Sequence, residues 1–121
     1  MQTDTMTRYL LTIYQLGGAI HDIRSIQIAN ALLVSRSCVV KTLKNLAEAG
    51  LVDKNPYSTV QLTPEGVRRG NQIYREFLLF KRFYMECLQM PEEVAAEDAA
   101  ASVCYLSETA KQRMFQVVLK N

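Results

Sequence analysis

Apolar residues recur every three or four positions over several stretches of the chain, and this spacing places them on one face of a helix. The first such stretch is TMTRYLLTIYQL at residues 5–16, followed by Gly17 and Gly18, a pair typical of a helix end. The pattern therefore predicts an N-terminal helix. Its inward face would carry Met6, Tyr9, Leu10, Ile13 and Leu16.

Two further helices follow, separated by a short turn. Residues 25–32, SIQIANAL, predict a short helix with Ser25 as its N-cap. Residues 36–50, RSCVVKTLKNLAEAG, predict a longer helix that Ser35 caps and Gly50 ends. The inward positions are Ile26, Ile28, Ala29 and Leu32 in the short helix and Val39, Thr42, Leu43 and Leu46 in the longer one.

The period then changes to that of a β-hairpin. Residues 51–52 and 59–62 are short β-capable runs around the turn KNPYS. Thr63 as cap, Pro64 in the first turn and the acid Glu65 predict the start of a long helix that reaches about residue 88. A helix starting in PEE at residues 91–93 and one capped by Ser107 complete the chain.

Two helices joined by a tight turn and followed by a hairpin predict a winged helix-turn-helix. The expected fold class is all-α with a small β-hairpin wing: a winged helix-turn-helix DNA-binding domain over residues 1–63 and a helical dimerisation domain over residues 64–121. Dimerisation is expected because the long helix carries more large apolar groups than so small a domain can cover. The residues expected at the dimer interface are Ile73, Leu78, Phe80, Phe83 and Tyr84.

The outward side of the helix over residues 36–50 has the chemistry of a DNA-recognition helix. Lys41 or Arg36 can donate to guanine O6 and N7, and a methyl of Val40 can touch thymine. Expected DNA contacts are Ser35, Arg36, Ser37, Cys38, Val40, Lys41 and Lys44 on this helix and Lys54, Asn55 and Tyr57 at the hairpin tip. The alternatives are a solvated basic face and a winged helix that binds protein instead of DNA.

Charge and composition narrow the function classes. The net charge is only +2, but the segment from Arg24 to Lys54 contains five basic residues and only two acidic ones. The chain has no run near the ~20 apolar residues of a membrane helix, and no basic, apolar signal peptide starts it, so a cytoplasmic location is expected. Three cysteines without a CxxC pair favour neither a disulfide framework nor a zinc knuckle. His21 is the single histidine, so no catalytic triad can form and no enzyme is expected.

The chain resembles the diphtheria-toxin-repressor family of iron- and manganese-dependent transcriptional repressors. The resemblance rests on YLLTIYQL, IANALLVSRSCVVKTLKNLAEAGLV, NPYSTVQLTPEG, IYREFLLFKRF and MPEEVAAEDA, which together cover nearly the whole chain. It implies a homodimer that binds double-stranded, pseudo-palindromic operator DNA. It also implies a short form that lacks a C-terminal SH3-like domain.

In this family, the resemblance implies, metal ligands come from the first helix, the long helix and the helix after it. The corresponding positions hold Arg8, Leu11, Phe77, Ala100, Val103 and Cys104, where only the last side chain is a potential ligand. Transition metals need several converging donors. The sensor site is therefore expected to be degenerate, with no metal or other cofactor required. If the family role persisted, the metal would be Mn(II) or Fe(II).

Two alternatives for regulation remain open at this point. The protein could respond to oxidation of Cys104 or Cys87, or it could bind a metal through a different set of residues. The nearest candidates for such a set are Glu76, Glu86, Asp98 and Cys104.

Overall fold

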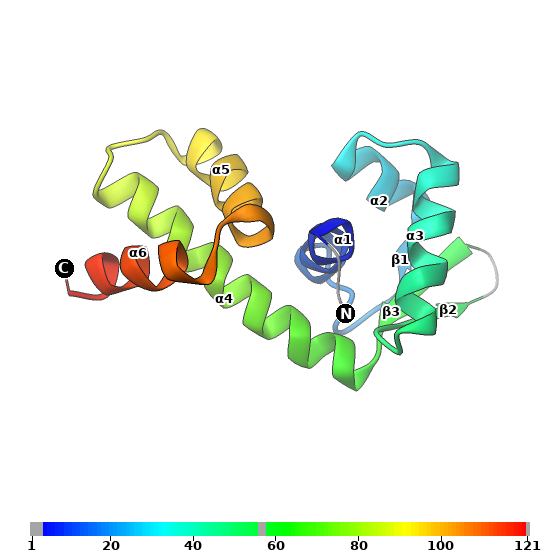
Figure 1. Cartoon of the computed structure of the whole chain (residues 1–121). Coiled ribbons are helices and arrows are strands. Elements are labelled where there is room, and N and C mark those ends of the chain that lie inside the picture. Colours follow the sequence, from blue (N-terminus) through cyan, green and yellow to red (C-terminus); the bar gives the residue numbers. More distant parts are fainter. Residues whose placement is uncertain (1–3, 56–57, 121) are drawn as a thin grey trace. The chain divides into compact units, whose positions relative to one another are not determined.

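The computed structural model describes residues 4–55 and 58–120 (Figure 1). Over these residues the chain is mostly helical with one small antiparallel sheet, which confirms the expected fold class. In order, the elements are α1 (Asp4–Gln15), β1 (Ile23–Arg24), α2 (Ser25–Leu32), α3 (Arg36–Glu48), β2 (Val52–Asn55), β3 (Thr59–Leu62), α4 (Pro64–Glu86), α5 (Glu92–Tyr105) and α6 (Glu108–Lys120).

The chain divides into two compact units, Met1–Gln72 and Ile73–Asn121, and the division falls inside α4. The sequence places a domain boundary at the start of this helix, whereas residues 64–72 belong with the first unit. Two glycines explain how they pack there. A Cβ on Gly66 would lie 2.0 Å from the backbone oxygen of Leu51, and a Cβ on Gly70 would lie 2.5 Å from the ring of Tyr14. The Tyr14 hydroxyl also donates to Asn71 Oδ1 at 2.5 Å.

The first unit is a helix-turn-helix against a sheet of strand order β1-β3-β2. Antiparallel pairing places Ile23 opposite Val60 and Val52 opposite Leu62. The hairpin agrees with the sequence prediction, while β1 is an additional strand that was not expected. The core of the first unit includes side chains with no exposed surface: Leu10, Ile13, Ile23, Ile28, Val39, Leu46 and Val60. Each such burial stabilises the fold by roughly 1.5–3 kcal/mol.

The turn between α2 and α3 occupies residues 33–35. Leu33 takes the left-handed conformation at φ 56° and its backbone N–H donates to Ala29, closing α2. Ser35 caps α3 as expected, because its Oγ accepts from the Cys38 backbone N–H at 3.2 Å. The predicted inward stripe of α3, Val39, Thr42, Leu43 and Leu46, is buried.

Two predictions for α2 are wrong. Ser25 is the first helical residue and not the N-cap, which is Arg24; the Ser25 hydroxyl instead donates to the Ser58 carbonyl at 3.0 Å. Ile26 is 40% exposed instead of inward-facing. Residues two apart on a helix point about 200° apart, so Ile26 cannot share a face with the fully buried Ile28. Leu32 is half-buried.

The second unit packs the C-terminal part of α4 with α5 and α6. Phe80 is fully buried, and its ring centroid lies 4.8 Å from that of Phe115 in α6. The Tyr84 hydroxyl lies 2.6 Å from Ser102 Oγ, and that oxygen also donates to the Asp98 carbonyl at 2.7 Å, which ties α4 to α5. Ser107 caps α6 as predicted, by accepting from the Ala110 N–H at 3.1 Å.

None of the helices in the described part of the chain combines the length and the apolar character needed to cross a membrane.

Candidate nucleic-acid interface

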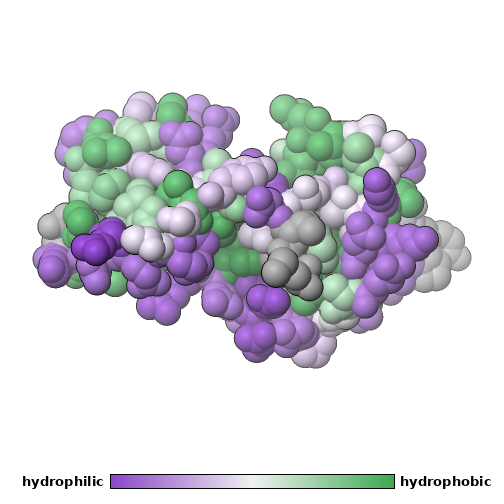
Figure 2. All heavy atoms as spheres, in the orientation of Figure 1, coloured by the Kyte–Doolittle hydropathy of each residue, from purple (hydrophilic) through white to green (hydrophobic). Residues whose placement is uncertain are grey.

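The outward side of α3 is exposed and largely polar. Ser37, Lys41 and Lys44 recur at helical spacing opposite the buried stripe, and all three are exposed. Figure 2 shows hydrophilic residues gathered over α3. Glu48 ends the same face with a negative charge that a polyanion would repel. The basic, hydroxyl-bearing part of the face is thus confined to the N-terminal two-thirds of the helix.

The first turn of α3 is held in place by its cap. Ser35 Oγ lies 3.1 Å from Ser37 Oγ in addition to its bond with the Cys38 N–H. Both hydroxyls are exposed, so each can also meet an external partner. The cap therefore fixes the direction in which Ser37 and the basic residues behind it point.

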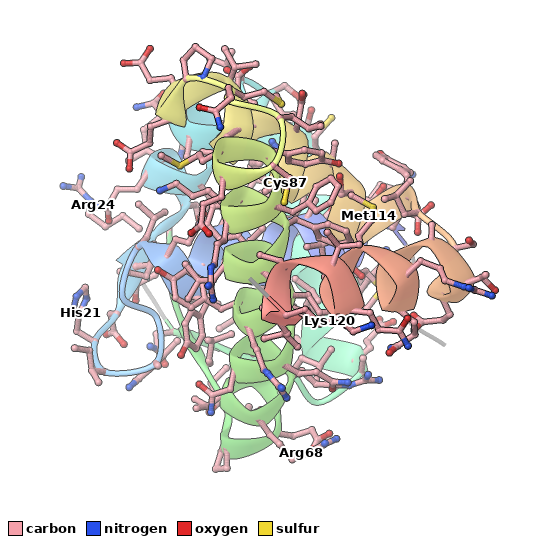
Figure 3. All side chains as sticks on the ribbon, turned by 90° about the vertical axis from the view of Figure 1, so that its left-hand side faces the viewer. His21, Arg24, Arg68, Cys87, Met114 and Lys120 are labelled. Atoms are coloured by element: carbon pink, nitrogen blue, oxygen red, sulfur yellow. The ribbon has the colours of Figure 1, made fainter. Side chains whose placement is uncertain are left out.

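A hollow of about 320 Å³ lies along one flank of α3. It is lined by Arg36 at the start of α3 and by Ser58 in the wing. The start of α2 contributes Arg24, Ser25 and Ile26. Arg24 projects outward from the start of α2 (Figure 3). The two guanidinium groups make this hollow suited to an anion such as a phosphate, while the half-buried Ser25 hydroxyl already donates to the Ser58 carbonyl. Sequence reasoning assigned Arg36 to the recognition face but did not select Arg24, Ser25 or Ser58.

A second hollow of about 450 Å³ lies on the other flank, between α1 and α3. Its polar groups include Thr5 from α1 and Cys38, Lys41 and Asn45 from α3. Tyr9 also lines it, and burial raises the pKa of this phenol, partly offset by its hydrogen bond with Thr42. Cys38, expected on the recognition face, is exposed and lies toward this flank.

The wing presents only part of the predicted set. Lys54 in β2 is exposed, as a backbone contact requires. Asn55 is half-buried, and its Nδ2 donates to Asp22 Oδ1 at 3.2 Å, so the amide fastens the wing to the segment before β1. Tyr57 lies outside the described residues.

Comparison with known proteins places this arrangement in a family. Residues 1–60 match the sequence profile described as "Iron dependent repressor, N-terminal DNA binding domain". The chain belongs to the diphtheria-toxin-repressor family. The matched region ends within β3, so it includes α1–α3, every residue that lines the two hollows, and most of the wing.

Similar proteins agree with this membership. An uncharacterised HTH-type transcriptional regulator of Methanocaldococcus jannaschii is 28% identical over 92 residues, which are 76% of this chain and 74% of that protein. The transcriptional regulator MntR of Escherichia coli is 30% identical over 100 residues, which are 83% of this chain and 64% of MntR.

A structure titled as a manganese-dependent transcriptional repressor in complex with manganese superposes with a TM-score of 0.81 at 22% identity. At this identity the likeness establishes the fold. The alignment covers 96% of this chain and 53% of that structure, so the chain spans about half the length of this structural relative.

The positions that the family resemblance assigns to metal ligands hold an arginine, four carbon side chains and one thiol. In the first unit, Arg8 is half-buried and Leu11 is 1% exposed. In the second unit, Phe77, Ala100, Val103 and Cys104 are all buried. In residues 4–55 and 58–120, no three His, Cys, Asp or Glu side chains come together as a group that could hold a metal ion. The Cys104 sulfur is the one metal-donor atom among these six side chains. The six side chains therefore do not fit the Mn(II) or Fe(II) ion that the resemblance implies.

Two of the four residues in the alternative ligand set form ion pairs with basic side chains. Glu76 Oε1 accepts from Lys111 Nζ at 2.9 Å, and Glu86 Oε2 accepts from Arg82 Nε at 2.9 Å. Asp98 is exposed, whereas Cys104 is buried. The structure does not bring these side chains together into a site.

The residues expected at a dimer interface differ in exposure. Leu78 is exposed, and Phe83 and Tyr84 are half-buried. Ile73 and Phe80 are buried within the chain, Phe80 against Phe115, so neither offers much surface to a partner. Exposed apolar side chains that sequence reasoning did not select include Val117 and Leu119 on α6.

Proposed function

We propose that the protein is a transcriptional regulator that binds double-stranded operator DNA through α3, as a homodimer and without a transition-metal corepressor. The observation that carries the DNA-binding proposal is the exposed N-terminal part of α3. It bears Ser37, Lys41 and Lys44, is fixed by the Ser35 cap, and is flanked by a hollow on each side.

The two hollows give this proposal its geometry. A recognition helix in the major groove has a phosphate backbone on either side of it. The hollow with Arg24 and Arg36 offers two guanidinium groups to one backbone. The hollow between α1 and α3 offers the Asn45 amide and the Thr5 hydroxyl to the other. Base edges are then read by the α3 side chains between the two hollows.

Metal independence is supported by the chemistry of the sensor positions. Mn(II) and Fe(II) prefer several oxygen and nitrogen donors, and the matched positions supply an arginine, four carbon side chains and one thiol. A cation beside Arg8 would also be repelled. In this proposal, the DNA-binding form requires no bound ion at these positions.

Homodimerisation is supported by apolar surface on the second unit. Leu78 on α4 and Val117 and Leu119 on α6 remain between 45% and 59% exposed. A second copy of the chain would cover such groups and would present two α3 helices to two half-sites.

The experiment is selection of binding sites from random duplex DNA, followed by mobility-shift titration of the selected sequence over a salt series. We expect a selected pseudo-palindrome and an affinity that falls steeply with salt as counterions are released. Lys120→Ala, on the exposed end of α6 (Figure 3), is the matched control and should leave the affinity unchanged. Failure to select any sequence would contradict the proposal.

A further inference from the structure

Val40 is an apolar side chain in polar surroundings. It is 58% exposed in α3. Arg36 and Ser37, four and three positions before it, and Lys44, four positions after it, are exposed as well, while Leu43, three positions after it, belongs to the buried stripe. The buried stripe of α3 does not include Val40.

The fold gains little from a valine at this position. An exposed valine contributes little burial, and a β-branched side chain loses χ1 freedom in a helix, so alanine would be the better helix former at this position. What valine does provide is two methyl groups on a stiff side chain, held at the outward surface of α3.

The major groove contains one apolar group that fits such a side chain. Among the four bases only thymine carries a methyl group on its major-groove edge, at C5. Lys41 and Lys44 follow Val40 on α3 and are exposed, so they can donate to purine or phosphate acceptors near that thymine.

We propose that Val40 reads the C5 methyl group of a thymine in each operator half-site and is a specificity-determining residue of this protein. The inference rests on the proposed function, since it requires α3 to lie in the major groove. An apolar contact with the C5 methyl group distinguishes thymine from the other three bases. The positive charge of a lysine or arginine does not make this distinction.

The test replaces each thymine of the selected operator, one at a time, by deoxyuridine, which removes the methyl group and keeps the base pair. Affinities are measured for the natural protein, for Val40→Ala and for Val40→Thr, which keeps one methyl. At one thymine per half-site, we expect uracil to weaken the natural protein about fourfold, in line with loss of one buried methyl. The same substitution should have no effect on Val40→Ala and an intermediate effect on Val40→Thr.

Val94→Ala is the matched control, since this residue is an exposed valine of α5 that is assigned to neither the DNA-binding nor the dimer surface. It should show the same uracil sensitivity as the natural protein. Two results would overturn the role of Val40 while leaving operator binding intact. In the first, uracil at no position changes the affinity of the natural protein. In the second, uracil lowers the affinity of Val40→Ala as much as that of the natural protein. If no operator can be selected at all, the proposed function itself fails, and the two failures are therefore distinguishable.

Discussion

Lys111 Nζ lies 2.9 Å from Glu76 Oε1, and the two side chains are only 9% and 22% exposed. Glu108 lies 3.6 Å from the same ammonium. This pair joins α6 to α4 inside the second unit and uses the carboxylate that stands next to Phe77, the position matched to a family ligand. Glu76 thus serves a structural ion pair in this chain.

Removing one partner of this pair should destabilise the protein. Glu76→Gln leaves a largely buried ammonium with only the more distant Glu108, and such losses cost about 3–5 kcal/mol when burial is complete. We expect a loss near the lower end of that range in the free energy of unfolding, measured by urea denaturation. The control is Glu86→Gln, which breaks the exposed Arg82–Glu86 pair and should cost below about 1 kcal/mol. Equal small losses in both variants would show that the Lys111 pair contributes little.

Gly66 and Gly70 should differ in their response to alanine. Alanine favours a helix by about 1 kcal/mol over glycine, yet at position 66 the new Cβ would meet the backbone oxygen of Leu51. Because that backbone cannot easily move, Gly66→Ala should cost about 1–3 kcal/mol. At position 70 the obstacle is the Tyr14 ring, which can turn aside, so the loss should be smaller. Thermal unfolding of the two variants compares them directly, and a stabilised Gly66→Ala variant would contradict this packing.

A carboxylate at position 103 should unfold the second unit instead of restoring a sensor. Val103 is 4% exposed, so Val103→Glu would bury a charge without a designed partner. We expect a loss of several kcal/mol in stability, with no recovery on adding Mn(II). Val94→Glu, at an exposed valine of the same helix α5, is the control for the charge itself. A Val103→Glu protein that is stabilised by Mn(II) would indicate that other donors complete the site.

Lys41 and Lys54 should affect DNA binding in different ways. Lys41→Ala should weaken the selected operator by about 1–3 kcal/mol and relax the preference at one base pair, as a bidentate-like contact would. Lys54→Ala should weaken all sequences alike and reduce the salt slope, because a wing lysine meets phosphate. Mobility-shift assays on operator and random duplexes separate the two. Equal losses on both duplexes for Lys41→Ala would assign it to the backbone only.

Local chemistry explains which parts of the fold could be predicted. Ser35 and Ser107 are caps that act within three residues of themselves, and the α3 stripe from Val39 to Leu46 follows from spacing alone. Pairing across the chain could not be seen in this way. The strand β1 has two residues and exists because Ile23 pairs with Val60, far along the sequence.

The same distinction holds for the candidate interface. The exposed set on α3 follows from one helix, whereas its flanks are assembled from α1, α2 and the wing, which is why Thr5, Arg24 and Ser58 were not selected. Asn55 has the right chemistry for DNA, but its amide is bound to Asp22, a contact between residues 33 positions apart. The apolar character of Ile26 favours an inward position, whereas its angle on α2 turns it outward, where it is 40% exposed.

The most direct test of metal-independent operator binding is titration of the selected operator with purified protein of known metal content, with chelator and with added Mn(II), Fe(II) or Zn(II). The sensor positions Arg8, Leu11, Phe77, Ala100, Val103 and Cys104 predict the same operator affinity under all of these conditions. Loss of binding on chelation, with recovery on adding one of these metals, would contradict the account and place metal ligands elsewhere in the chain.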